Sequence, residues 1–222
     1  AEGGEPGDHV SLQGGREELG RSALAEHGGN RQHFEVTVTN ITSGQTFTPL
    51  LVVSHTRHVE LFELGEPALT ELAIIAEGGD VGPMDALLNG LHGKVGATAN
   101  SGGLLGPGES VTVEVAAGGR FNRISVVGML IPTNDTFVAL DSAPIWNWEN
   151  DYLVPAYDAG SEHNDELCAS IPGPVCGGEG YSDADGEGYV HISRGISGFG
   201  DLEAANYDWR NPVAKISIRR KR

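Results

Sequence analysis

Alternation of apolar and polar residues along the chain predicts a protein built mostly from β-strands. Residues 34–39 (Phe-Glu-Val-Thr-Val-Thr) alternate strictly and are rich in β-branched side chains, which is typical of a strand with one face in solvent. Residues 110–115 repeat this pattern, with valines on one face and Thr112 and Glu114 on the other. Residues 213–219 alternate as well, so we predict a third half-buried strand there.

Two further stretches are apolar almost throughout, which indicates strands buried on both faces. They cover residues 49–55 and 123–131. The second stretch breaks at Pro132, passes through an Asn-Asp pair and then continues as another apolar run. It therefore predicts two strands joined at the rim of the core. A short strand is also predicted at residues 189–192.

Helical spacing of apolar residues occurs twice, at residues 67–78 and 83–91. Each segment begins with a proline suited to a first helical turn and is followed by glycine. Residues 141–188 show no regular pattern, and a long irregular segment in a compact domain is usually functional. Many short strands, two local helices and frequent turn residues predict an all-β fold, an antiparallel β-sandwich with one or two short helices in an insertion.

The chain divides into an N-terminal arm and one domain. Residues 1–33 combine glycine, charge and histidine with few apolar residues, so we expect a flexible arm at 1–33 and a β-sandwich domain at 34–222. The 222 residues suffice for one well-buried core. The alternative for the arm is that it becomes ordered against another subunit or surface.

Charge excludes some partners and suggests others. The chain has 31 acidic and 14 basic residues, a net charge of −17, and five of the basic residues fall in the last eight positions. An acidic body repels phosphate backbones, so we expect no nucleic-acid partner. The basic C-terminal residues are Arg219, Arg220, Lys221 and Arg222. They are candidates for contact with the acidic body of another copy or with a polyanion, and a solubilising strand end is the alternative.

Two cysteines suggest an oxidising compartment. Cys168 and Cys176 flank a short segment rich in glycine and proline, and we predict a disulfide between them, with a reduced pair as the alternative. Closing so short a loop contributes about 2–3 kcal/mol in the chain-entropy model. No apolar run has the length of a transmembrane helix. Because the chain begins at Ala1 rather than Met, we expect a mature product that is secreted to the extracellular space or the periplasm.

Acidic residues at the ends of apolar runs are candidate metal ligands. Asp135 follows the break at Pro132, and Asp158 follows the apolar stretch 152–157. Our hypothesis is that the two aspartates meet around a Ca²⁺ ion, which prefers six to eight oxygen ligands. For any one acidic residue among 31, the alternative is a solvated surface charge.

A second acidic segment resembles the start of a calcium loop. Asp183, Asp185 and Glu187 alternate with small residues around Gly186, although the spaced Glu that completes an EF-hand is missing. We treat it as a possible second calcium site, with a plain acidic turn as the alternative.

Histidines and tryptophans provide two other candidate sites. His55 and His58, together with His191, form a candidate transition-metal site, and solvated or hydrogen-bonded histidines are the alternative. Trp146 and Trp148 are candidates for stacking on a sugar or a protein partner, with anchoring in the core as the alternative. The sequence contains no nucleophile elbow, zinc-protease motif or phosphate loop, so we expect no enzymatic activity.

Several motifs occur together in a specific order. They are Val38-Thr39-Asn40-Ile41-Thr42, Phe62-Glu63-Leu64-Gly65, Ala76-Glu77-Gly78-Gly79-Asp80, Pro132-Thr133-Asn134-Asp135, Tyr157-Asp158-Ala159-Gly160, Ile171-Pro172 and Trp209-Arg210-Asn211-Pro212. In this order they resemble the spondin N-terminal domain, which is found in F-spondin, mindin and secreted bacterial proteins. The resemblance covers about residues 34–219.

The resemblance implies a secreted, C2-like eight-stranded β-sandwich that serves adhesion to matrix or cells. It also implies a bound calcium ion held by a Glu on a strand, an Asp after the proline turn and the Asp of a Tyr-Asp-Ala-Gly motif. These positions correspond to Glu114, Asp135 and Asp158. The cysteine pattern of the animal proteins is missing, so the Cys168–Cys176 pair is a local feature.

Together these observations predict a secreted, calcium-binding module for adhesion, matrix attachment or self-assembly. Its expected partners are an extracellular protein or glycan, or copies of the chain itself. The alternatives are a histidine-based transition-metal protein and a carbohydrate-binding module.

Overall fold

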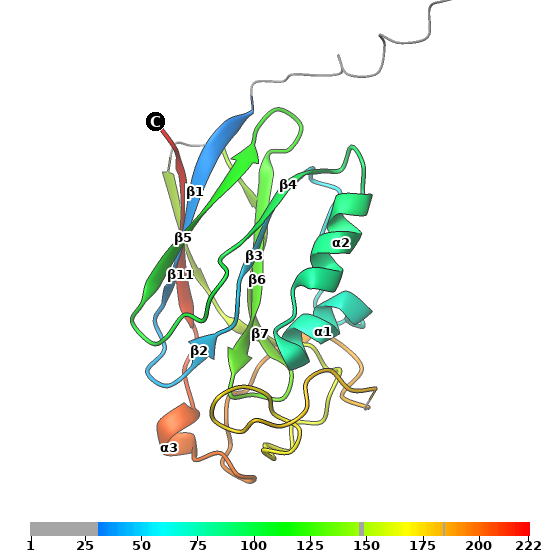
Figure 1. Ribbon diagram of the computed structural model, residues 1–222, viewed down its shortest axis with the longest axis vertical. Helices are drawn as coiled ribbons and strands as arrows, with labels where there is room; N and C mark the ends of the chain where they lie inside the picture. The colour runs from blue at the N-terminus through cyan, green and yellow to red at the C-terminus, as the bar shows by residue number, and fades with distance from the viewer. Residues whose placement is uncertain (1–30, 147–148, 184) are drawn as a thin grey trace, which may run out of the picture.

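The computed structural model describes residues 31–146, 149–183 and 185–222, which form two antiparallel β-sheets packed face to face (Figure 1). Most of the predicted arm and Trp148 lie outside the described residues. Regular structure begins at Gln32, two residues before the predicted domain boundary. The prediction of an all-β sandwich is confirmed.

The smaller sheet has four strands. In spatial order they are β5 (Ser110–Ala117), β1 (Gln32–Asn40), β11 (Ala214–Arg220) and β8 (Glu149–Val154). Buried and less buried positions alternate along β1 and β11, because one face of this sheet meets the core and the other meets solvent.

The larger sheet has seven strands. Its main order is β10 (His191–Ile192), β9 (Ala156–Asp158), β7 (Thr136–Pro144), β6 (Arg123–Ile131), β3 (Leu51–His55) and β4 (Val95–Asn100), and β2 (Thr46–Phe47) also pairs with β6. Strands β3 and β6 are buried along nearly their whole length, as their continuous apolar sequences predict.

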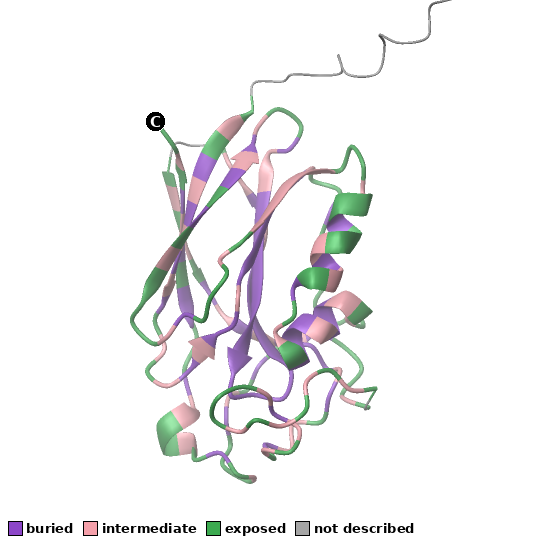
Figure 2. Cartoon of the chain, viewed as in Figure 1, coloured by how far each residue is buried: buried purple, intermediate pink, exposed green. Residues whose placement is uncertain are grey.

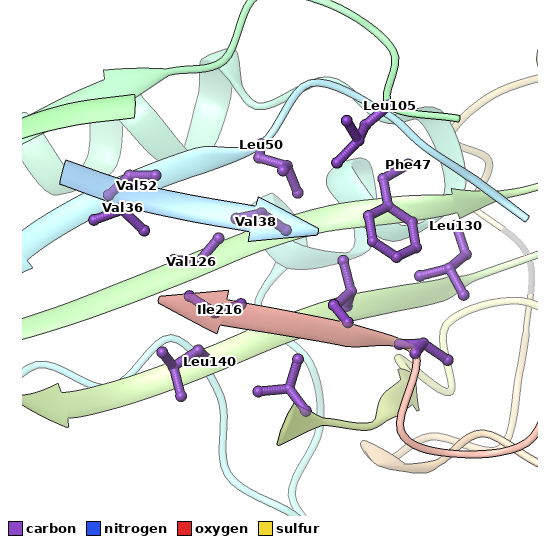
Figure 3. Close-up of a cluster of buried hydrophobic side chains, with 14 of the residues drawn as sticks. Val36, Val38, Phe47, Leu50, Val52, Leu105, Val126, Leu130, Leu140 and Ile216 are labelled. Atoms are coloured by element: carbon purple, nitrogen blue, oxygen red, sulfur yellow. The ribbon is translucent and has the colours of Figure 1, made fainter. Parts of the chain in front are cut away.

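The main core lies between the two sheets (Figure 3). Val38 and Ile216 of the smaller sheet point toward Val126, Leu130 and Leu140 of the larger one, and all five side chains are buried. Burying each such side chain stabilises the fold by about 1.5–3 kcal/mol relative to exposure. This core holds the two sheets together and fixes the ends of their strands in space.

A second core lies on the outer face of the larger sheet, under two helices. These are α1 (Thr70–Gly78) and α2 (Gly82–Gly90), which occupy the insertion between β3 and β4 (Figures 1 and 2). Leu72 and Ile75 of α1 pack in the same buried cluster as Val127 and Phe137 of the sheet. The helices therefore explain why the central strands are apolar on both faces.

Five elements were not predicted from the sequence. Strands β2 and β9 are only two and three residues long, and α3 (Ala204–Tyr207) has four residues. Strand β4 contains mostly small residues, and strand β8 is an edge strand with a polar sequence. Strands β8 and β9 lie inside the segment 141–188 that we expected to be irregular, so that prediction is wrong for its first part. Between Ala159 and Val190 the described chain has no helix or strand, in agreement with the prediction.

The disulfide prediction is confirmed. Cys168 and Cys176 are joined with an S–S distance of 2.07 Å and a Cα–Cα distance of 4.7 Å, within the usual range for a bridge. The bridge closes a loop within the irregular segment. Among the described residues, none of the helices has the length and apolar character needed to cross a membrane.

Candidate metal centre

Asp135 is fully buried at the turn between β6 and β7, and the described residues form hydrogen bonds to only one of its carboxylate oxygens. Its Oδ2 accepts hydrogen bonds from the backbone N–H groups of Ser161 (2.8 Å) and Glu162 (3.1 Å). Its Oδ1 has no hydrogen-bond partner among the described residues. Burial, together with repulsion from Asp158, raises the pKa of Asp135 to about 8. A buried carboxylate oxygen without a partner requires an explanation, and a bound cation is one.

Asp158 ends β9 and is held beside Asp135 by strand pairing. In the β7–β9 ladder Asp158 lies opposite Thr136, the residue that follows Asp135. The Asp158 carboxylate accepts hydrogen bonds from Gly160 N (2.9 Å) and from the Asn164 side-chain amide (2.9 Å). Burial raises its pKa as well. The sheet register thus brings together two buried carboxylates that repel each other.

Two more side chains complete the site. Asp158, Glu187 and His191 each place one ligand atom so that all three atoms lie within 4.8 Å of one another. His191 lies opposite Asp158 in the β9–β10 ladder, and its Nε2 is 3.3 Å from Asp158 Oδ1 without forming a hydrogen bond. The Asn164 amide also donates to Glu187 Oε1 (3.2 Å). We call Asp135, Asp158, Glu187 and His191 the Asp158 cluster.

The loop geometry around the cluster depends on Gly160. Its φ of +64° is in the left-handed region, and a Cβ added there would lie 2.3 Å from the carbonyl oxygen of Tyr189. Its carbonyl accepts a hydrogen bond from Gly188 N (2.8 Å), which holds the Glu187 segment against Asp158. A glycine after Tyr-Asp-Ala is therefore needed so that the two segments can approach each other.

The donor set of the Asp158 cluster fits a divalent cation. The carboxylates of Asp158 and Glu187, with the charge of Asp135 beside Asp158, are hard oxygen ligands of the kind that calcium prefers, and one imidazole suits a transition metal. A cation would neutralise the repulsion between Asp135 and Asp158 and would give Asp135 Oδ1 a partner. Asn164 would hold two of the carboxylates in place through its amide.

Glu114 is not part of this site, and its assignment from the resemblance is corrected here. The residue lies on β5 in the smaller sheet, faces solvent and forms an ion pair with Lys221. In the β1–β5 ladder Glu114 lies opposite Glu35. Glu35 in turn lies opposite Arg219, close to the C-terminal end of β11. The alternation that puts Glu114 on the polar face of its strand also directs it away from the core and from Asp135.

The acidic segment 183–187 does not form a separate calcium loop among its described residues. Glu187 belongs to the Asp158 cluster instead, and it is exposed, as are Asp183 and Asp185. Burial raises the pKa of Glu77, and the charge of Asp183 adds to this shift. A calcium site in this segment stays a prediction, and the structure groups Glu187 with Asp158 and His191 rather than with Asp183 and Asp185.

The three histidines are not brought together. His55 is buried, with Nδ1 2.8 Å from Thr56 O and Nε2 2.7 Å from Ser125 Oγ, so both of its ring nitrogens are engaged. Burial lowers its pKa. Three strands lie between β3, which ends at His55, and β10, which carries His191. The strand registers also place the two histidines at opposite ends of β7, His55 level with Pro144 and His191 level with Thr136. His58 is exposed.

The remaining predicted contact residues lie elsewhere. Trp146 is 68% exposed, and the guanidinium of Arg123 lies 5.0 Å from its ring centroid. Trp209 is 7% exposed and belongs to the main core. At the C-terminus Arg219 pairs with Glu149 at 2.6 Å, and Lys221 pairs with Glu114. Arg220 ends β11 and Arg222 is exposed at the chain end.

His191, a member of the Asp158 cluster, and Asn164, which donates to two of its carboxylates, are not apparent as site residues from the sequence. The histidine pattern groups His191 with His55 and His58 instead, and Asn164 belongs to none of the motifs. The signal that could have found His191 is its position in a short strand next to an acidic segment. Its pairing with Asp158 depends on sheet order, which alternation of residues does not specify.

The fold and the carboxylate cluster at one end of the larger sheet define the class of protein as a β-sandwich with a candidate cation site in its loops. A model of the Spondin_N family matches residues 31–164, more than half of the chain, so the protein belongs to the Spondin_N family. The resemblance seen in the sequence is thereby confirmed. Asp135 and Asp158 lie within the match, whereas Glu187 and His191 lie beyond it. No curated protein matches the chain.

Proposed function

We propose that the protein is a secreted, calcium-stabilised β-sandwich that acts as a non-catalytic adhesion or matrix module. The observation that carries the calcium part is Asp135 Oδ1, a buried carboxylate oxygen without a hydrogen-bond partner among the described residues, beside a second buried carboxylate. The family, which is of an extracellular type, and the disulfide support the extracellular part.

Calcium would act by joining elements that repel one another without it. Asp135 comes from the β6–β7 turn, Asp158 from β9 and Glu187 from the irregular segment. A ligand that binds only the folded state stabilises it by about 2.7 kcal/mol at a free concentration one hundredfold above its Kd. Ion binding would therefore order the loops at this end of the sandwich, and a partner could bind to the ordered loops.

The ligand set also favours a second candidate, a transition-metal site that uses His191. An imidazole nitrogen within 4.8 Å of two carboxylate oxygens is a donor set that Zn²⁺ or Mn²⁺ accepts. This version does not require His55 or His58. Calcium is preferred because carboxylates outnumber the single imidazole in the Asp158 cluster.

Adhesion or self-assembly would use the surfaces that the fold leaves uncovered. The outer face of the larger sheet is covered by α1 and α2, whereas the outer face of the smaller sheet is open (Figure 2). That open face carries hydrogen-bonded Thr37–Thr112 and Thr39–Ser110 pairs. Polar side chains held in fixed positions are suited to recognise a glycan or a polar protein surface.

Thermal unfolding of the metal-stripped full chain tests the calcium proposal. We expect saturating calcium to raise the melting temperature by roughly 5–10 °C, since about 2–4 °C accompany each kcal/mol in a domain of this size. The substitutions Asp135→Asn and Asp158→Asn should each remove this rise.

Glu114→Gln is the matched control, because it removes a carboxylate that lies outside the Asp158 cluster. It should leave the calcium-dependent rise intact. Equal shifts in all variants, or no shift in the wild type, would contradict a calcium site at Asp135 and Asp158. A shift with Zn²⁺ or Mn²⁺ but not Ca²⁺, lost in His191→Ala, would favour the transition-metal version.

A further inference from the structure

A second group of buried oxygens lies at the C-terminal end of α1, outside the Asp158 cluster. Glu77 is in the last turn of this helix and is fully buried. A carboxylate is unfavourable there, because the C-terminal end of a helix carries a partial negative charge. Burial raises the pKa of Glu77, which shows how poorly solvated its charge would be.

Only one oxygen of Glu77 has a hydrogen-bond partner among the described residues. Its Oε2 accepts from Ser182 N (2.8 Å), whereas Oε1 is buried without a partner. In the described part of the chain, the hydroxyl oxygens of Ser161 and Ser182 are buried without hydrogen-bond partners as well. The Ser161 hydroxyl is close enough to Glu77 to act on its pKa, although it makes no hydrogen bond of normal geometry.

Glu162, in the loop that follows β9, is a second buried carboxyl, and its charge interacts with that of Glu77. It is 6% exposed, and burial together with repulsion from Glu77 raises its pKa to about 7. The Asn134 amide donates to its carboxylate at 3.4 Å. The other charges that act on these two carboxyls come from Asp165, Glu179 and Asp183, and every one of them is negative. The charges that the described residues place around the two buried carboxyl groups are thus negative, and a cation would balance them.

We infer that Glu77, Ser161, Glu162 and Ser182 form a second site for a hard divalent cation of the calcium class. We call these four residues the Glu77 cluster. Glu77 Oε1 and the Glu162 carboxylate would be its charged ligands, and the two serine hydroxyls would supply neutral oxygens. The donors are all oxygens, with no His or Cys among them, so a transition metal is disfavoured. Their irregular arrangement suits Ca²⁺ better than the octahedral demands of Mg²⁺.

The inference goes beyond the proposed function, because the Glu77 cluster shares no side chain with the Asp158 cluster. The two are nevertheless linked through one stretch of backbone. The N–H groups of Ser161 and Glu162 donate to Asp135, while their side chains belong to the Glu77 cluster. Binding at one cluster would therefore order the peptide groups that shape the other.

Counting bound ions tests the inference on the full, metal-stripped chain. Equilibrium dialysis against radioactive Ca²⁺ should give two ions per wild-type chain. Glu77→Gln, which keeps the size of the side chain and can still accept from Ser182 N, should lose one ion and retain the one that Asp135→Asn removes. Asp183→Asn is the matched control, because it removes a nearby but exposed charge and should leave two ions bound.

Full ion binding in folded Glu77→Gln protein would overturn the inference, since Glu77 would then be only a buried hydrogen-bond acceptor for Ser182. If Glu77→Gln shows no cooperative unfolding, Glu162→Gln is measured in its place and is read in the same way. One ion in the wild type, lost in Asp135→Asn but kept in Glu77→Gln, would overturn this inference and leave the proposed function standing. The reverse pattern would support the Glu77 cluster and overturn the calcium site at Asp135.

Discussion

At the scale of single residues, Asp135 combines strong backbone hydrogen bonds with an unfavourable charge. Two N–H groups hold Oδ2, yet burial and Asp158 raise the pKa of Asp135 to about 8. Without a cation the folded protein therefore takes up a proton that the unfolded chain, with a carboxyl pKa near 3.8, does not hold. Metal binding and proton binding compete for the same oxygen.

This competition predicts a specific pH dependence of metal-free stability. The pKa of Asp135 is higher in the folded protein than in the unfolded chain, so its protonation stabilises the folded state. This contribution to the free energy of unfolding is complete below about pH 4 and is lost as the pH rises to about 8. The free energy of unfolding of the metal-free protein should fall with a slope of up to about 1.4 kcal/mol per pH unit in that window. Urea denaturation at several pH values measures it.

The Asp135→Asn variant supplies the comparison for this measurement. It cannot take up the proton, so the slope should be shallower, although Asp158 and Glu162 still contribute with the same sign. Parallel curves for wild type and variant would contradict the assignment of the buried proton to Asp135. Saturating calcium should flatten the wild-type curve above pH 6, because the ion favours the charged carboxylates.

Gly160 permits a second prediction at this scale. Alanine there would combine a left-handed φ, which costs about 1–2 kcal/mol, with a Cβ placed 2.3 Å from Tyr189 O. The loops must then move apart, and the Glu187 segment leaves Asp158. We expect Gly160→Ala to weaken calcium binding at least tenfold, measured by calorimetric titration.

Gly108→Ala is the matched control for this substitution. Gly108 has a φ of +76° but nothing within 4 Å of an added Cβ, so alanine carries the backbone cost without the clash. It should lower the melting temperature modestly and leave calcium affinity unchanged. Equal calcium affinity in the two variants would mean that close approach at Gly160 does not shape the site.

At the scale of elements, the sequence predicted those strands whose burial pattern is simple. Strand β1 alternates because one face is in solvent, and β6 is apolar along most of its length because α1 covers its outer face. Strand β8 lies at the edge of the smaller sheet, where polar residues such as Glu149 and Asp151 face solvent. Such a sequence has no apolar alternation to detect, and charges at an edge also discourage unwanted pairing.

The candidate site was predicted where local sequence determines position and missed where sheet order does. Asp135 and Asp158 each follow an apolar run, so their place at the rim of the core could be inferred from the sequence. Glu114 was placed wrongly because the sequence does not say which sheet β5 joins. His191 meets Asp158 only through the β9–β10 pairing, which brings together residues 33 positions apart in sequence.

At the scale of the whole molecule, charge is distributed unevenly between the two ends of the sandwich. The candidate cation sites lie in the loops at one end, and the basic C-terminus lies at the other (Figure 1). Arg219 and Lys221 are paired with glutamates of their own sheet. Exposed pairs of this kind contribute only about 0–1 kcal/mol, so exchanging them for pairs with another copy costs little.

This layout predicts self-association between unlike ends that weakens with salt. A basic end that meets the acidic loops of the next copy makes a heterologous contact, which extends into a filament unless it closes. Sedimentation of the full chain should show assembly at 0.05 M salt that is lost at about 1 M, where the Debye length falls to about 3 Å. Arg222→Glu should weaken it, and a chain lacking residues 1–30 tests whether the predicted arm contributes.

Lys215→Glu is the control for charge alone. It changes the net charge by the same amount as Arg222→Glu but lies on the open face of the smaller sheet, beside Asp151. If both substitutions weaken association equally, overall repulsion is the cause and the contact between unlike ends is wrong. Assembly that depends on Arg222 and also on calcium would support a contact between the basic C-terminus and the acidic loops. Calcium bound in the acidic loops lowers the negative charge that attracts the C-terminus. Added calcium should therefore shift the assembly to shorter filaments.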